Sequence, residues 1–237
     1  MTPLELAGRS RGVAVLLTLS GGFLDAFTYV GHGGVFANAM SGNIALLGIH
    51  MASGDWTQAA RHVPPLVAFV LAVCVAHLLS LTRVNQYIRR PALVCLLLEI
   101  GFLALAASNL VPVSDIWLIP GITFVATLQT LSFTHVGNLA YTSVMTTGNL
   151  RRATKMLLEG LIPRYDKGAL HDASLLGAAG FCFLTGAVLG GYTTAVAKDK
   201  AMWIAVLLLV AALARMCQLA RRESVRRSAE SNSSNFA

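Results

Sequence analysis

Long apolar stretches joined by short polar connections constrain this chain more than any other feature of its sequence. Of the 237 residues, 55% are hydrophobic and only 12% are charged, about half the charge of a typical soluble domain. A helix needs roughly 20 apolar residues to cross the hydrocarbon core of a bilayer, and several stretches reach or approach that length. They are residues 13–30, 33–53, 63–81, 92–111, 116–133, 138–150, 173–197 and 202–214. The sequence therefore predicts an all-α, polytopic integral membrane protein with six to eight transmembrane helical segments.

A polar phrase occurs twice inside this apolar sequence. In the first half, residues 24–27 (LDAF) lead to residues 41–44 (SGNI), and in the second half residues 128–131 (LQTL) lead to residues 147–150 (TGNL). A polar motif repeated within apolar helices is typical of membrane proteins built from two related halves around one site. We therefore predict an internal duplication.

The predicted organisation is a single integral membrane domain over residues 1–220 followed by a tail. The two repeats cover about residues 12–111 and 115–220. Residues 221–237 are basic and then rich in Ser and Asn, which predicts a disordered cytoplasmic tail near anionic headgroups. Residues 151–165 are amphipathic, and we expect them to lie along the cytoplasmic interface.

The net charge of +7 lies mainly in the connections between apolar stretches. Charge in that position sets membrane orientation, so nucleic acid is not an expected partner. The second and sixth apolar stretches either cross fully, which gives eight crossings, or dip in and return, which gives six. Six crossings place more basic residues inside, because Arg83, Arg89 and Arg90 join that side and only Arg61 leaves it. Both versions put the two termini in the cytoplasm.

The length of these two stretches gives conflicting indications. Residues 33–53 carry no Lys, Arg, Asp or Glu and are long enough to cross. A helix from Asn138 to the residue before Arg151, by contrast, covers about 20 Å at 1.5 Å per residue, which is short of a full crossing. Four crossings per half predict parallel repeats and three predict inverted repeats, and the sequence leaves both open.

Asp25 is the first candidate site residue. A carboxylate near the centre of a transmembrane helix costs roughly 2.5–3.5 kcal/mol to insert, so such a residue normally faces a partner, a cavity or an ion path. Gly21, Thr28, Tyr29 and His32 share its helical face, which we expect to look inward. One hypothesis makes Asp25 a proton or cation coupling site with His32 as a relay. The other makes it a hydrogen-bonded residue that fastens two helices.

The paired Gly-Asn steps carry the most specific signal. An Asn side chain has both a donor and an acceptor, and an adjacent Gly lets a ligand or another backbone approach closely. Asn43, Asn149 and Gln129, which occupies the repeat position of Asp25, are candidates for binding a small polar solute or for pinning irregular backbone. Ser41 and Thr147 precede the Gly-Asn steps and are secondary candidates.

Glu99 is the other acid deep in an apolar stretch, and no basic residue lies within two turns of it. A polar or basic group that offsets the cost of burying this carboxyl group must therefore come from another helix. His77, in the preceding apolar stretch, is the predicted partner, either as a plain Glu-His helix pair or as part of a substrate site.

The motifs also resemble those of a known family. Residues 22–26 (GFLDA), 34–36 (GVF) and 40–43 (MSGN), with the later Thr-Gly-Asn of residues 147–149, resemble the YoaK-like bacterial membrane proteins, the domain of unknown function 1275. The resemblance covers about residues 12–220. It implies a multi-pass protein of the bacterial inner membrane and no established activity.

No enzyme signature is present: the sequence has no phosphate-binding Gly-Lys-Ser, no Gly-x-Ser-x-Gly and no His-Glu-x-x-His. We expect no catalytic residues, no cofactor and no metal. The leading hypothesis is a small secondary transporter or permease-like protein for a small polar solute, with Asp25 binding a proton or cation. The alternative is a non-transporting membrane scaffold or partner-binding protein whose polar residues pack helices. The expected partners are the lipid bilayer, the solute or proton, and a second copy of the chain.

Overall fold

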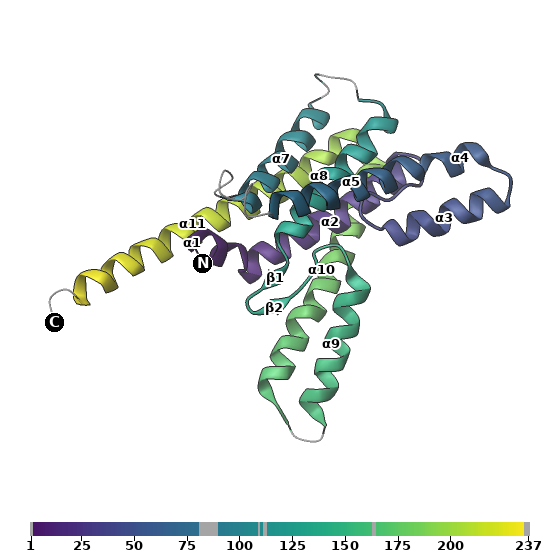
Figure 1. Ribbon diagram of the computed structural model, residues 1–237. Coiled ribbons are helices and arrows are strands. Elements are labelled where there is room, and N and C mark those ends of the chain that lie inside the picture. The colour runs from purple at the N-terminus through teal and green to yellow at the C-terminus, as the bar shows by residue number, and fades with distance from the viewer. Residues whose placement is uncertain (1, 81–89, 109, 111–112, 163–164, 235–237) are drawn as a thin grey trace.

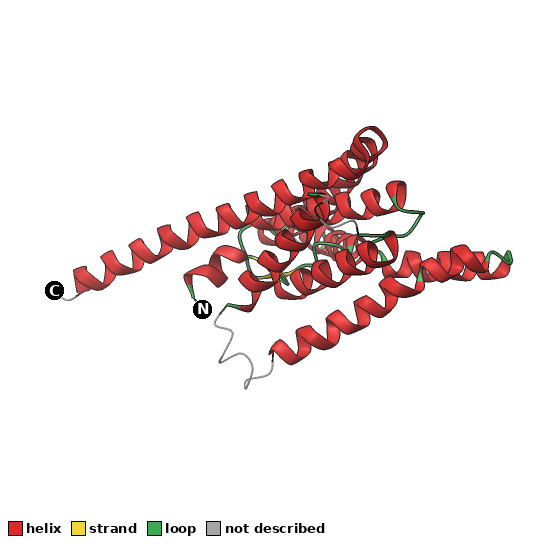
Figure 2. Cartoon of the chain, turned by 90° about the horizontal axis from the view of Figure 1, so that it is seen from above, coloured by secondary structure: helices red, strands yellow, loops and turns green. Residues whose placement is uncertain are grey.

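The computed structural model describes residues 2–80, 90–108, 110, 113–162 and 165–234. Helices make up nearly all of this part of the chain (Figures 1 and 2). They are α1 (Pro3–Gly8), α2 (Arg11–Gly31), α3 (Met40–Ala52), α4 (Trp56–Arg61), α5 (Val63–Ser80), α7 (Pro91–Ala107), α8 (Asp115–Ser132), α9 (Thr146–Leu161), α10 (Lys167–Ala197), the 3₁₀ turn η1 (Lys198–Ala201) and α11 (Met202–Ser234). Two short antiparallel strands, β1 (His135–Val136) and β2 (Leu139–Ala140), form a small hairpin.

Three helical stretches within the described residues are long and apolar enough to cross a membrane. They are Arg11–Gly31, Trp56–Leu79 and the continuous Lys167–Ser228, which contains α10, η1 and α11 as far as Ser228. The helices α3 and α7 are apolar but shorter. The prediction of an all-α chain with apolar helices of membrane-spanning length is therefore confirmed.

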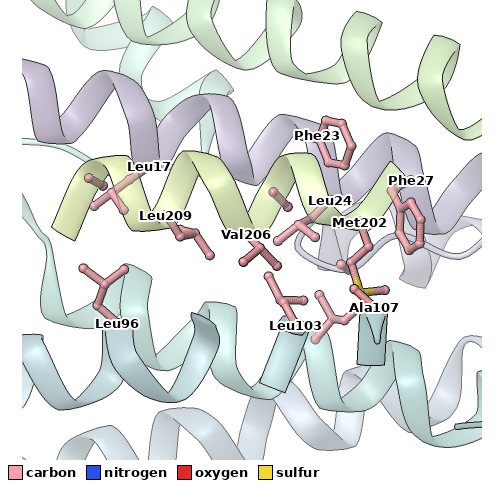
Figure 3. Packing of buried hydrophobic residues seen from close by; sticks show 14 of the residues in the cluster. Leu17, Phe23, Leu24, Phe27, Leu96, Leu103, Ala107, Met202, Val206 and Leu209 are labelled. Carbon is pink, nitrogen blue, oxygen red and sulfur yellow. The ribbon is translucent and has the colours of Figure 1, made fainter. Parts of the chain in front are cut away.

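The main hydrophobic core lies between α2, α7 and α11, as Figure 3 shows. Large apolar side chains from one face of each helix interdigitate there with almost no exposed surface. Those labelled in the figure are Leu17, Phe23, Leu24 and Phe27 of α2, Leu96, Leu103 and Ala107 of α7, and Met202, Val206 and Leu209 of α11. This core holds together helices that lie far apart in the sequence.

The first helices of the two halves run in opposite directions. Gly8, just before α2, lies against Phe133 at the end of α8, where a Cβ on Gly8 would be 3.3 Å from the ring. At the other end of the bundle, His32 at the end of α2 contacts Asp115 at the start of α8. We call these the N-terminal end and the His32 end. The helices α2 and α8 are therefore antiparallel.

The helix α2 packs along α10 and α11. Its contact with α10 is close enough for backbones to touch, because a Cβ on Gly22 would overlap the carbonyl oxygen of Phe183, and one on Gly186 would overlap that of Leu19. Gly190 lies one turn further along α10 and against the backbone of Phe23 in the same way. Since contacts advance together along both helices, α2 and α10 are parallel. Small residues allow such approach between membrane helices.

The helix α8 has the corresponding set of partners, since it packs along α5 and α7. Pro64 and Ile116, near the starts of α5 and α8, line one cavity, and Leu79 and Leu131, near their ends, line another. The helices α5 and α8 are therefore parallel, like α2 and α10. The remaining long helices of the two halves, α7 and α11, pack against each other.

Two predicted helical segments are helical only in part. In residues 33–53 the helix begins at Met40, because Gly33 and Gly34 have φ of 82° and 78° and end α2 in an irregular segment. In residues 138–150 the helix begins at Thr146 and then continues through the amphipathic stretch to Leu161 as one helix, α9. The hairpins α3–α4 and α9–α10 project from the bundle in different directions (Figure 1).

The predicted disordered tail is helical as far as Ser234, because α11 continues through it. Glu223 bonds to Arg226 and Arg227, one turn later on the same face, and such pairs stabilise an exposed helix. Other predictions fall outside the described residues. These are the segment ends at Leu81 and Val111, the charges at Arg83 and Arg89, residues 163–164 of the amphipathic stretch, and residues 235–237 of the tail.

Candidate functional site

Two irregular segments enter the bundle from opposite ends and meet between α2 and α8. The first, residues 33–39, starts at the His32 end. The hydroxyl of Thr123 in α8 donates a 2.8 Å hydrogen bond to the carbonyl of Ala37. The side-chain amide of Asn38 donates to the carbonyl of Gly21 in α2 at 3.3 Å. Gly21 and Thr123 lie near the middle of their helices, so this segment reaches the interior of the bundle.

The second segment, residues 133–145, starts at the N-terminal end, contains the β1–β2 hairpin and is irregular from Tyr141 onward. The hydroxyl of Tyr141 donates to the carbonyl of Ala14 in α2 at 3.1 Å, and the hydroxyls of Ser143 and Thr130 in α8 lie 3.2 Å apart. A Cβ on Gly21 would be 2.8 Å from the side chain of Val144. Gly21 therefore touches both irregular segments, and we call this meeting place the Gly21 junction.

The two Gly-Asn steps hold these segments with the same contact. Asn43 Oδ1 accepts a hydrogen bond from the backbone N–H of Phe36 at 2.9 Å, and its Nδ2 donates to the carbonyl of Phe36 at 2.7 Å. Asn149 makes the same pair of bonds to Thr142, at 3.3 and 2.6 Å. Both side chains are buried, and each clamps the residue seven positions earlier. Of the two roles that the sequence left open for these amides, the observed contacts match the pinning of irregular backbone.

Asp25 lies beside the first irregular segment and is 4% exposed. Its Oδ1 accepts a hydrogen bond from the backbone N–H of Asn38 at 2.6 Å. Within the described part of the chain, its buried Oδ2 has no hydrogen-bond partner. With one oxygen the carboxyl group thus fastens the segment that leads into α3 to α2.

Gln129 is buried in α8, 3% exposed. Its Oε1 lies 3.5 Å from the hydroxyl of Thr130, and among the described residues its buried Nε2 has no partner. Each of positions 25 and 129, which the sequence pairs as predicted repeat positions, therefore carries one buried polar atom without a partner in that part of the chain. One is an acceptor and the other a donor.

His32 lies at the end of α2, 6% exposed, and not beside Asp25. Its Nδ1 is 2.8 Å from Asp115 Oδ1, and its Nε2 is 3.8 Å from Asp199 Oδ1. Tyr29, which we expected on the inward face, is 42% exposed and stacks on Phe36. The polar face of α2 is thus buried at Asp25, Thr28 and His32 but not along its whole length.

The secondary candidates lie in different environments. Glu99 is buried in α7, with no partner for Oε2 among the described residues, whereas His77 lies on an exposed face of α5. The structure therefore places the two members of the predicted Glu-His pair in different surroundings. Ser41 and Thr147 are both exposed, on the first turns of α3 and α9.

Two cavities lie near the ends of the α5–α8 contact. The cavity at the His32 end has a volume of about 340 Å³, and its polar groups come from His32, Thr57, Arg61 and Asp115. The cavity at the N-terminal end has a volume of about 410 Å³. Neither is lined by the four candidates of the central site, Asp25, Asn43, Gln129 and Asn149.

Sequence reasoning did not select Asn38, Ser143 or Asp115. Asn38 and Ser143 lie in stretches interpreted as helical, where a polar residue gives no separate signal. The Gly33-Gly34 pair, just after the expected end of α2, was the available indication that the chain turns there. Asp115 precedes an apolar stretch and is typical of a helix start, so only the tertiary structure reveals its contact with His32.

Neither a curated protein nor a solved structure matches this chain. A sequence profile does match, over residues 13–215, which span every helix from α2 to α10 and the apolar part of α11. The matched region includes both Gly-Asn steps and the Gly21 junction. The chain therefore belongs to the family described as "Protein of unknown function (DUF1275)".

Proposed function

We propose that this protein is a small secondary transporter built from two inverted repeats, which moves a small polar solute across the bacterial inner membrane. The observation that carries the proposal is the Gly21 junction. Two irregular segments enter from opposite ends and meet beside a buried acid, which is the arrangement by which inverted-repeat transporters form a binding site near the middle of the bilayer. Irregular backbone at that depth is tolerated only where protein buries it or a cavity lies beside it.

The exchange of helix partners supports the inverted duplication. The first long helix of each half packs in parallel on a later helix of the other half, as α2 does on α10 and α8 does on α5. The same helix also packs on the last helix of the other half, as α2 does on α11 and α8 does on α7. Because α2 and α8 are antiparallel, a two-fold axis lying in the membrane plane relates these pairs in the proposed arrangement.

Six crossings follow from this arrangement. The helices α2, α5, α7, α8, α10 and α11 would cross, while α3 and α9 return to the end from which their irregular segments entered. The shortest of the six are α7 with 17 residues and α5 and α8 with 18 each, within the range for a transmembrane helix. Basic residues gather at the N-terminal end, which the positive-inside rule assigns to the cytoplasm together with both termini.

In this account Asp25 binds a proton or cation during transport. It is buried, retains one oxygen without a partner in the described part of the chain, and its other oxygen holds the segment that leads into α3. A change in the charge of this carboxyl group would therefore alter the hold on that segment. This links ion binding to a movement of irregular backbone.

A specific observation favours a second candidate, the non-transporting scaffold. The amides of Asn43 and Asn149 are bonded to backbone, and neither cavity is lined by the central candidates. Under this alternative the polar residues pack helices or hold a partner protein. Asp25 then only stabilises the fold, by its hydrogen bond to Asn38.

Proton flux and solute uptake by the purified chain in liposomes separate the two. The comparison is between the wild type, Asp25→Asn and the control Glu159→Gln, which removes an exposed acid from α9. The transporter account expects flux with at least one solute of a panel of small polar compounds, lost in Asp25→Asn and retained in Glu159→Gln. The absence of flux with every solute, together with a lowered stability of Asp25→Asn, would favour the scaffold.

A further inference from the structure

The cavity at the N-terminal end combines a basic rim with apolar walls. Its rim includes Arg9, from the turn between α1 and α2, and Arg90, just before α7. The backbone near Arg9 is held in place, because its carbonyl accepts a 2.7 Å hydrogen bond from Gly137 in the β1–β2 hairpin. The position of the Arg9 backbone therefore follows from the fold and not from a free loop.

The rim has a surplus of positive charge. Glu5 is the acid among the lining residues, and its carboxylate accepts the backbone N–H of Thr2 at 2.8 Å, as part of the cap of α1. Among the described residues, no ion pair joins Arg9 or Arg90 to an acid. Two arginines thus line the cavity, and guanidinium groups bind phosphate well because they present several donors in one plane.

Besides the polar side chains of Thr2, Ser132, Thr134 and His135, the cavity has apolar walls, which come from four long helices. They are formed by Ala76 and Leu79 of α5, Ala92 and Leu93 of α7, Leu131 of α8 and Met216 of α11. A volume of about 410 Å³ falls within the range of small-molecule sites. A cavity with this shape at the end of a helical bundle suits an amphiphile with an anionic head.

We infer that this cavity binds the phosphate headgroup of an anionic lipid, with the phosphate between Arg9 and Arg90 and the start of an acyl chain along the apolar walls. Basic pockets between membrane helices are suited to anionic headgroups. A free phosphate compound would use only the rim and would leave the apolar walls uncovered. The inference does not depend on transport.

The test uses the full-length chain in detergent and measures lipid binding by native mass spectrometry. Phosphatidylglycerol is compared with phosphatidylcholine, and glycerol 3-phosphate is the free-phosphate probe. The double variant Arg9→Gln/Arg90→Gln removes the rim charges. Its control is Arg221→Gln/Arg222→Gln, which removes the same charge from exposed residues of α11 that do not line the cavity. Ala76→Phe, or Ala92→Phe if the first variant does not fold, fills the cavity and keeps both arginines.

We expect the wild type to prefer phosphatidylglycerol and the rim variant to bind it about tenfold or more weakly, because each basic group near an anionic headgroup contributes substantially. The control pair should keep wild-type binding, and the cavity-filling variant should lose it. An unchanged affinity in the rim variant, or an equal loss in the control pair, would overturn the inference. So would competition by glycerol 3-phosphate at concentrations similar to those of the lipid, because that result would indicate a site for soluble anions.

Discussion

The side-chain amide of Asn43 bonds to both backbone groups of Phe36, seven residues earlier in the chain. The corresponding amide in the second half, that of Asn149, bonds in the same way to Thr142. Each pair closes a loop that turns the chain from an irregular segment into a helix, α3 or α9. A shared local structure of this kind explains why the Gly-Asn step stands at the same place in both halves.

Removal of either clamp should destabilise the protein by a similar amount. Asn43→Ala and Asn149→Ala each leave a backbone N–H and a carbonyl without their side-chain partner, at a cost of about 1–3 kcal/mol. Asn138→Ala, at an exposed turn position, is the control and should have little effect. Unfolding of the purified variants in detergent measures the difference. A neutral result at one clamp and a large loss at the other would contradict the equivalence of the two halves.

The backbone contact between α2 and α10 should be the part of the fold least tolerant of added volume. Gly22→Ala and Gly186→Ala each place a methyl group on a backbone carbonyl of the other helix. Overpacking of this kind typically costs about 1–3 kcal/mol, and more where backbone cannot move. Gly101→Ala, in α7, is the matched control because a Cβ there has no neighbour within 4 Å.

Thermal unfolding in detergent and the yield of folded protein measure this effect. The control should match the wild type or exceed it slightly, because Ala favours a helix interior more than Gly does. If Gly22→Ala and Gly101→Ala behaved alike, the close approach of α2 and α10 would be wrong.

His32 and Asp115 should show a measurable but small coupling. Their ring nitrogen and carboxylate oxygen are 2.8 Å apart, but Asp115 is 52% exposed, so water screens the interaction. A double-mutant cycle of His32→Gln and Asp115→Asn should give about 0.2–1 kcal/mol. The same cycle with Asp199→Asn serves as a comparison and should give less, because that contact is 3.8 Å long. A larger coupling to Asp199 would indicate that a different contact closes the His32 end.

The sequence predicts the helices well, because long apolar stretches leave the backbone few alternatives in lipid. It also identifies Asp25 and both Asn residues as unusual. It does not predict that Asn43 and Asn149 bond to the backbone of Phe36 and Thr142. An Asn in an apolar stretch gives the same sequence pattern whether its amide binds a solute or the chain itself. The partial helicity of residues 33–53 and 138–150 was missed because irregular backbone inside a bundle carries buried apolar side chains as a helix does, and Val35, Ala37 and Tyr141 are examples.

The proposal of two inverted halves is tested most directly by measuring on which side of the membrane the ends of α8 lie. In a variant with Cys74, Cys95, Cys182 and Cys217 replaced, a single cysteine is placed at Ser114 or at Asn138, both exposed. A membrane-impermeant thiol reagent is then applied to intact cells and to inverted vesicles. Inverted repeats with six crossings predict labelling of Ser114→Cys from outside and of Asn138→Cys from inside. The reverse labelling, which eight crossings require, would contradict the account.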